Sequence, residues 1–505
     1  MNAFRFGAST LILTSLVACG QPQAMLLNQP GAQLQNRPST VRVGAKWVLK
    51  ERSAHIPGEV VVQVKANQGF STQSLRAFSA AGSRPKQRLR VQNQEFMLMN
   101  VPQQQDINQV LQQLRQDPAV QYADYNPRYM ALQNYPQAPR PMGYGTMPRV
   151  GLFNTGTPAV GSGTAPNSAP GALNDAFAPL QWSLNKVGIP NAWNIGGQGR
   201  AEVLVAVIDS GVDYQHPDLK GQIVNGKDFM PDTVSGPNGE GSPDAVGNDP
   251  LDQMGHGTHV AGVIAALSNN RTGIAGIAPG VKVLNIKTLN RDGWGSAFAV
   301  AQGITSAVDQ GARIINLSLG SSDGSKPIEL AIQYAQSKGA LIIAASGNAF
   351  TKTFFPARYP GVLAVGATNQ DDWLADFSNH DERINVVAPG VDIMSTTPTY
   401  TTNTMLQQKI DSFYSVMSGT SMAAPMVSAQ AALLLSRNPN LTAQQLQEII
   451  QKTARKVGDH RIFGHGRIQI DASLDYLASQ QPPTTAPPAA GDPAQINAQR
   501  FVYRR

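Results

Sequence analysis

Three residues far apart in the chain could together make a hydroxyl group nucleophilic. Asp209 ends a run of apolar residues, His256 lies between two glycines, and Ser421 precedes a stretch rich in alanine. A serine hydroxyl attacks a carbonyl carbon near neutral pH only if a base takes its proton, a carboxylate orients that base, and hydrogen-bond donors hold the oxyanion that forms. The sequence offers one candidate for each of these groups.

Each candidate alone also has an ordinary structural explanation. His256 could be a buried or capping histidine, and a serine at the start of a helix is more often a cap than a nucleophile. The positive end of a helix nevertheless favours developing negative charge at Ser421. His259 could form a metal pair with His256, but the glutamate and the i, i+4 spacing of a zinc-protease helix are missing.

The elements that must position these residues alternate along the second half of the chain. Apolar runs predict strands at 203–209, 281–289, 313–320, 341–348 and 362–368, and amphipathic or alanine-rich segments predict helices at 256–267, 296–310, 327–338, 421–436 and 442–454. This alternation predicts an α/β fold with a doubly wound, mostly parallel sheet. Sites in such sheets form at the carboxyl ends of the strands, where Asp209 lies.

Three sequence blocks resemble the signature blocks of the subtilisin-like serine proteases. They read DSGVD at 209–213 with HPD at 216–218, HGTHVAG at 256–262 and GTSMAAP at 419–425. Their order, Asp then His then Ser, is also that of the family. The resemblance extends over 181–477 and implies a serine endopeptidase acting on proteins or peptides. It assigns Asp209 as the orienting carboxylate, His256 as the acid and base, and Ser421 as the nucleophile.

The same resemblance implies further site residues. The segment AASGN at 344–348 is similar to the oxyanion block of the family, which makes the Asn348 side chain one oxyanion donor and the backbone N–H of Ser421 the other. Ser318, Leu319 and Gly320 resemble the edge segment that pairs with the substrate backbone. The loop at 349–360 should wall the pocket for the residue before the cleaved bond, without fixing its side-chain preference.

Calcium is the cofactor that we expect. The segment 267–274 resembles a calcium loop of this family, with carbonyl ligands from Leu267 and Ile274 and side-chain oxygens from Asn270 and Thr272. Carboxylates would come from Asp218 and Asp175. The alternative is a plain turn rich in asparagine. The acidic loop at 244–252 could hold a second ion, although a solvated loop is favoured, and we expect no organic cofactor.

The N-terminal part of the chain predicts a second folded unit. Strands at 59–65, 88–92, 96–101 and 120–125 with helices at 71–81 and 106–115 have the order of a ferredoxin-like α+β unit. This unit, at 45–130, resembles the propeptide that assists folding in the family, inhibits the enzyme and is then cut off. The linker at 131–172 is rich in Pro and Gly, leaves the cleavage position open and would allow the two parts to stay joined.

The chain begins with a predicted signal peptide. Residues 1–20 combine Arg5 with an apolar run at 8–17. Cys19 is the single cysteine of the chain and follows Leu-Val-Ala, as in a bacterial lipoprotein signal, so we expect lipidation there; an ordinary cleaved signal is the alternative. A flexible spacer at 21–44, a peptidase domain at 173–480 and a Pro-rich tail at 481–505 complete the predicted organisation. The protein should be secreted, and a lipid could anchor it to the cell envelope.

Composition excludes few functions. The chain has 505 residues and a net charge of +7, but its 40 Lys and Arg are scattered among 33 Asp and Glu, so we expect no nucleic acid partner. Two other readings remain: a catalytically idle peptide-binding protein and a calcium-stabilised structural protein of the envelope. Turnover separates both from a protease.

Overall fold

The computed structural model describes residues 42–43, 46–47, 54–65, 84–133, 173–230 and 249–480. These residues belong to one compact unit that begins at Pro38. The predicted signal peptide with Cys19, the helix at 71–81 and the tail lie outside the described residues. So do the spacer at 21–44 except 42–43, nearly all of the linker, and most of the acidic loop at 244–252.

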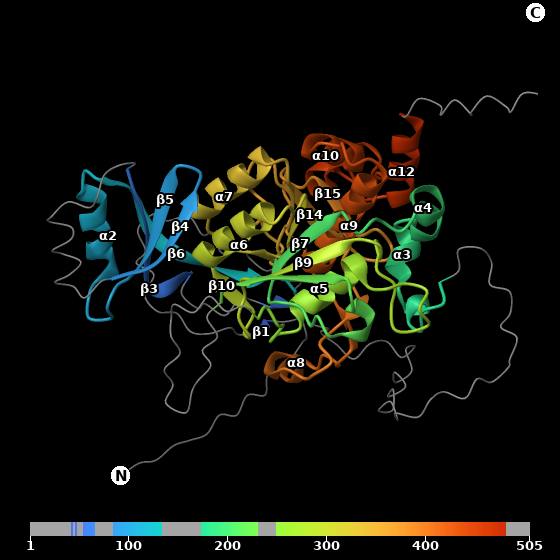
Figure 1. Cartoon of the computed structure of the whole chain (residues 1–505), viewed down its shortest axis with the longest axis horizontal. Coiled ribbons are helices and arrows are strands. Elements are labelled where there is room, and N and C mark those ends of the chain that lie inside the picture. The colour runs from blue at the N-terminus through green and yellow to red at the C-terminus, as the bar shows by residue number, and fades with distance from the viewer. Residues whose placement is uncertain are drawn as a thin grey trace, which may run out of the picture. The chain divides into compact units, whose positions relative to one another are not determined.

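Four antiparallel strands of a six-stranded sheet form the N-terminal region, in the order β6-β3-β5-β4 (Figure 1). Three consecutive valines, 60–62, form the buried part of β3 and point alternately to the two faces of the sheet. Asp106 caps the start of the helix, where its side chain accepts the N–H of Asn108 at 2.9 Å. One face of the sheet packs on Val110, Leu111 and Leu114 of the helix. The elements are β3 (His55–Val64), β4 (Arg84–Val91), β5 (Gln94–Asn100), α2 (Ile107–Gln116) and β6 (Val120–Ala131); β1 (Arg42–Val43) pairs with β2 (Lys46–Trp47).

Seven parallel strands form the larger sheet, in the order β15-β14-β13-β11-β7-β9-β8. Strand residues point alternately to its two faces: Val205 and Val207 of β7 join one hydrophobic cluster, and Ala206 and Ile208 join the other. Both faces are therefore buried, which confirms the doubly wound α/β class. The strands are β7 (Leu204–Asp209), β8 (Ile223–Asp228), β9 (Lys282–Lys287), β11 (Ile314–Leu317), β13 (Leu341–Ala345), β14 (Leu363–Thr368) and β15 (Val386–Pro389).

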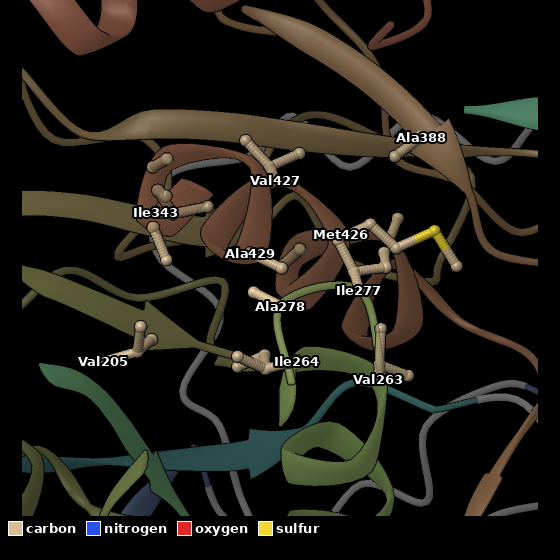
Figure 2. Packing of buried hydrophobic residues seen from close by; sticks show 14 of the residues in the cluster. Val205, Val263, Ile264, Ile277, Ala278, Ile343, Ala388, Met426, Val427 and Ala429 are labelled. Carbon is tan, nitrogen blue, oxygen red and sulfur yellow. The ribbon is translucent and has the colours of Figure 1, made fainter. Parts of the chain in front are cut away.

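Helices cover each face of this sheet. On one face, α5 (His256–Ala265) and α9 (Thr420–Arg437) pack on the strands, and Figure 2 shows Val263 and Ile264 of α5 in the same cluster as Met426 and Val427 of α9. Alanines along α9 let it lie close to its neighbours. Pro425 lies inside this helix and has no N–H to bond the Ser421 carbonyl, which accepts instead from Ser318 Oγ at 2.9 Å. The other face is covered by α6 (Ala297–Asp309) and α7 (Lys326–Ser337).

Shorter elements surround these layers. They are η1 (Ala178–Leu180), α3 (Trp182–Lys186), α4 (Ile189–Gly196), η2 (Pro217–Leu219), β10 (Trp294–Ser296), β12 (Leu319–Gly320), β16 (Ile393–Thr396), α8 (Asn403–Gln408), β17 (Tyr414–Met417), α10 (Ala443–Lys452), α11 (His460–Phe463) and α12 (Ile470–Ser479). Within the described ranges, no helix combines the length and the apolar character needed to cross a membrane.

Strand β6 is longer than the sequence predicts. We expected it to end at 125, because Asn126 and Pro127 usually terminate a strand, but it continues to Ala131. Its first part pairs with β3, and its last part pairs antiparallel with β10 (Figure 1). The last part also pairs antiparallel with β12. Pro127 lies at an irregularity in the pairing with β3, where the register shifts between the pairs Val60–Tyr125 and His55–Pro127, and such positions tolerate proline. The N-terminal region thereby reaches into the larger one.

His259 lies in the core rather than at a metal site. Its ring is fully buried in α5, and its Nε2 lies 3.0 Å from the carbonyl oxygen of Ile393, to which it donates. Burial lowers the pKa of His259 to about 3. Between about pH 3 and pH 6.5, the side chain of His259 is therefore neutral in the folded protein and protonated in the unfolded chain.

The stability of the protein should fall as the pH drops below about 6.5, partly because of this histidine. The unfolded state binds a proton there and the folded state does not, which costs up to about 1.4 kcal/mol per pH unit from one group. In His259→Gln, the free energy of unfolding should be lower at pH 7 but should decline less between pH 6.5 and pH 5 than in the parent. Urea unfolding of both proteins, each also carrying Ser421→Ala to prevent self-digestion, measures this. Parallel pH profiles would contradict it.

Candidate active site

Asp209 and His256 form a buried pair at the carboxyl end of the central strand. Asp209 is the last residue of β7, and His256 is the first residue of α5. The His256 Nδ1 lies 2.7 Å from the Asp209 Oδ1, and both side chains are buried. A carboxylate accepts only, so Nδ1 donates this hydrogen bond. A side chain at Gly257 would overlap the carbonyl oxygen of Gly211, which explains the glycine after His256.

A second buried carboxylate, Asp252, holds the segment that carries His256. Its Oδ1 accepts hydrogen bonds from Ser210 Oγ and from the backbone N–H groups of Met254 and Gly255, at 2.8–2.9 Å. Its Oδ2 accepts from the N–H and the hydroxyl of Thr258, at 3.0 and 2.6 Å. We did not single out this positioning residue in the sequence, where it only ends an acidic loop.

Ser421 lies in the first turn of α9, beside an extended piece of the chain. Its Oγ donates to the carbonyl oxygen of Ser318 at 2.9 Å, and its backbone N–H donates to the carbonyl oxygen of Leu132 at 3.2 Å. No hydrogen bond joins Ser421 Oγ to His256 in this conformation, and His256 Nε2 is buried without a hydrogen-bond partner among the described residues. The structure thus joins Asp209 to His256 directly and brings Ser421 to Ser318.

The amide orientation of Asn348 is fixed by its neighbours. Its Oδ1 accepts from the backbone N–H and the hydroxyl of Thr420, at 3.0 and 2.8 Å. Because a backbone N–H can only donate, the Nδ2 must point the other way. This Nδ2 is buried and has no partner among the described residues. A Cβ at Gly419 would lie 3.0 Å from this Nδ2 and 2.5 Å from the Leu132 carbonyl oxygen. Gly419, the Asn348 amide and the Leu132 carbonyl therefore lie close together.

The end of β6 lies as an added strand between β10 and β12. Ala131 and Met130 pair with Leu319 and Gly320 of β12. Across the other edge, β10 pairs with the same strand in antiparallel register. The Leu132 N–H donates to the Ser318 carbonyl at 3.2 Å. The predicted substrate-pairing residues Ser318, Leu319 and Gly320 therefore line an extended segment of the chain itself.

The predicted calcium residues gather around one loop. Asp175 accepts from the N–H groups of Asn269 and Asn270, at 2.9 and 3.0 Å. Asp218 accepts from Asn270 Nδ2 at 2.7 Å and from the N–H of Ile274 at 2.9 Å. Asn270 Oδ1 accepts from the N–H of Thr272, and the N–H of Leu267 donates to the Asp218 carbonyl.

The donor chemistry of this loop fits a hard cation. Burial, with a smaller contribution from the nearby Asp175 carboxylate, raises the pKa of Asp218 to about 6. A cation would relieve both effects, and the set consists of carboxylate, amide and carbonyl oxygens. No cluster of three or more His, Cys, Asp or Glu occurs in the part of the chain that the structure describes, so most ligands would be neutral oxygens.

Comparisons with known proteins agree with this architecture. The model of the subtilase family matches residues 200–466, and the model of the fervidolysin N-terminal prodomain matches residues 45–126. A thermophilic serine proteinase of Bacillus sp. (strain AK1) is 35% identical over 433 residues, which are 85% of this chain and 90% of that protein.

Two shorter relatives match a smaller part of the chain. Thermitase of Thermoactinomyces vulgaris is 38% identical over 302 residues, 59% of this chain and 98% of that protein. Subtilisin BL of Lederbergia lenta is 38% identical over 295 residues, 58% of this chain and 98% of that protein. The chain therefore belongs to the subtilase family and is a subtilisin-like serine protease with an N-terminal prodomain.

Proposed function

We propose that the protein is a secreted serine endopeptidase that hydrolyses proteins through Asp209, His256 and Ser421 and is made as a self-processing zymogen. The observation that carries this proposal is the extended strand end at the site: the Leu132 carbonyl oxygen lies 3.2 Å from the Ser421 nitrogen, as the acyl group of a peptide substrate would. The buried Asp209–His256 pair supplies the orienting carboxylate and the base.

The reaction begins when the Ser421 hydroxyl exchanges its bond to the Ser318 carbonyl for one to His256 Nε2. The oxygen attacks the substrate carbonyl carbon while His256 takes the proton, and Asp209 stabilises the imidazolium. The Ser421 N–H and Asn348 Nδ2 hold the oxyanion. His256 then protonates the leaving amine, and a water molecule that His256 deprotonates hydrolyses the acyl-enzyme.

The prodomain would inhibit the enzyme through the same contacts. Residues of β6 take the place of a substrate between β10 and β12, so no other peptide can pair there while they remain. Met130, Ala131 and Leu132 supply this backbone pairing. Release of the prodomain would therefore open the cleft.

Calcium would serve as a structural ion. Asp175 and Asp218 would supply its charged ligands, and Leu267, Asn270, Thr272 and Ile274 its neutral ones. The carboxylates of Asp175 and Asp218 lie at this loop while Leu132 still lies at Ser421. The ion site should consequently form before the prodomain is cut off.

Secretion and lipid anchoring rest on the sequence of the first 20 residues. Cys19, which lies outside the described residues, would carry the lipid. If the linker is cut, the anchor and the protease separate, and the released enzyme would be soluble outside the cell.

Removal of the nucleophile or of one oxyanion donor should reduce turnover by different amounts. Ser421→Ala should leave no measurable cleavage of an unstructured protein substrate, and Asn348→Ala should lower kcat about 10²–10³-fold, the range known for one such donor in subtilisin. Steady-state kinetics on enzyme freed of its prodomain measures both. The exposed Asn440→Ala is the matched control and should behave as wild type. Equal activity of Ser421→Ala and wild type would overturn the proposed mechanism.

Calcium should stabilise the uncleaved protein through Asp175 and Asp218. In the Ser421→Ala protein stripped with a chelator, added calcium at about 100 times its Kd should raise Tm by roughly 5 °C. Asp218→Asn or Asp175→Asn should remove most of that rise, because each takes away a charged ligand. Thermal unfolding measures the shift, and Asp475→Asn on the exposed side of α12 is the control. A rise that survives in both ligand variants would exclude this site.

Lipidation should depend on Cys19 alone. When the full chain is produced in a bacterium fed an alkyne-tagged fatty acid, the wild type and Gln23→Ala should carry the label and Cys19→Ser should not, because the chain has no other cysteine. Gel fluorescence of the purified protein reads the label. An unlabelled wild type whose N-terminus is not Cys19 would favour an ordinary cleaved signal peptide.

A further inference from the structure

One carbonyl of the N-terminal region lies at the Ser421 backbone N–H. The Leu132 N–H donates to the carbonyl of Ser318, and the Leu132 carbonyl accepts from the N–H of Ser421, both at 3.2 Å. One residue earlier, the Ala131 N–H donates to the carbonyl of Gly293 at 2.9 Å. These bonds fix the register, because a shift by one residue would exchange the buried and exposed faces of the strand. The Leu132 carbonyl that accepts from Ser421 belongs to the peptide bond between Leu132 and Gln133.

The Leu132 side chain fills a closely fitting pocket. It is only 4% exposed and belongs to the same hydrophobic cluster as Phe354. A Cβ at Gly320 would lie 2.9 Å from Leu132 Cδ1 and 3.0 Å from the carbonyl oxygen of Phe355. Glycine at 320 therefore leaves the room that a leucine side chain occupies, and an added methyl group there would take it away.

Three residues before Leu132, Tyr129 fills a second pocket that has a polar end. Its ring is fully buried, and its hydroxyl donates to the carbonyl oxygen of Asp323 at 3.0 Å. Tyr359 is the second polar neighbour of this hydroxyl. The Tyr359 hydroxyl in turn donates to the carbonyl oxygen of Ser325 at 2.8 Å. Burial keeps the pKa of Tyr129 well above its ordinary value, so the hydroxyl remains a donor.

The residues between the two pockets are less enclosed. Met130 and Ala131 are only partly buried and contribute backbone pairing with β10 and β12. Pairing through the backbone does not depend on side-chain identity, whereas a buried hydroxyl loses a hydrogen bond when phenylalanine replaces tyrosine. Selectivity is therefore concentrated at Tyr129 and Leu132.

We propose that the chain cuts itself between Leu132 and Gln133, and that the mature enzyme prefers substrates with leucine before the cleaved bond and tyrosine three residues earlier, whose hydroxyl the Asp323 carbonyl and Tyr359 recognise. This inference rests on the proposed function. In the step, Ser421 Oγ bonds to the Leu132 carbonyl carbon, the bond to the Gln133 nitrogen breaks, and His256 passes the serine proton to that nitrogen. Water then releases Leu132 as a carboxylate, and Gln133 becomes the new N-terminus.

The processing site is tested by intact-mass measurement of the chain produced from Gln21 onward. Wild type should yield a fragment that ends at Leu132 and one that begins at Gln133, and Ser421→Ala should remain whole. An enzyme that digests an unstructured protein but has its first cut elsewhere would overturn this inference and leave the proposed function standing. A wild type that neither processes itself nor digests the protein after removal of the prodomain would overturn the proposed function.

The preference is tested with synthetic peptides, which do not depend on the folding of a variant. A peptide of residues 127–136 should be cut by the mature enzyme after the leucine. Replacing Tyr129 of this peptide with phenylalanine should lower kcat/KM about 2–13-fold, the value of one neutral hydrogen bond. Replacing Tyr129 with alanine should lower it about 10–100-fold further by loss of apolar burial. Alanine in place of the methionine is the control and should change kcat/KM little.

An enzyme variant provides the converse test. Gly320→Ala should lower kcat/KM for the leucine peptide at least 10-fold relative to a peptide with alanine at that position, because the new methyl group occupies the leucine site. Equal rates for the tyrosine and phenylalanine peptides would overturn recognition of the hydroxyl. An unchanged leucine preference in Gly320→Ala would overturn the assignment of the leucine pocket.

Discussion

The parallel direction of the central strands is the constraint on which the site depends. Because β7, β11 and β13 run the same way, their carboxyl ends meet at one edge of the sheet. Asp209 ends β7, Ser318 follows β11, and Asn348 lies three residues beyond β13. Helices α5 and α9 begin at this edge and bring His256 and Ser421 with them. Residues separated by more than 200 positions are thus brought together by strand direction.

The buried carboxylates of the larger region differ in how many hydrogen bonds they accept. Asp209 accepts from the His256 imidazole and from the backbone N–H of Ser210, while Asp252 accepts five hydrogen bonds from donors around the His256 segment. A buried carboxylate is costly unless it is paired or hydrogen-bonded. Asp252 therefore fixes the backbone that carries His256. Burial raises the pKa of Asp218 to about 6, so a nearby cation would stabilise its charged form. The same physical effect produces a rigid support in one place and a candidate ion site in another.

The prodomain strand uses two kinds of interaction at the cleft. Its backbone pairs with β10 and β12 irrespective of side-chain identity, so the strand is held as any extended peptide would be. Tyr129 and Leu132 add enclosed side-chain contacts at two points. General affinity for extended chains and selectivity at two positions are consistent with an enzyme that acts on proteins and is inhibited by its own prodomain.

The sequence by itself determined the α/β class, the protease family and the candidate residues Asp209, His256, Asn348 and Ser421, because these follow from apolar periodicity and from local blocks of adjacent residues. Only the tertiary structure revealed that Asp252 holds the His256 segment and that β6 continues past Pro127 to bring Leu132 to Ser421. Asn126 and Pro127 look like a strand end when only near neighbours are considered. Pro127 still pairs with His55 of β3, and the strand beyond it is stabilised by β10 and β12, which lie more than 160 residues away in the sequence. No local pattern records such long-range pairing.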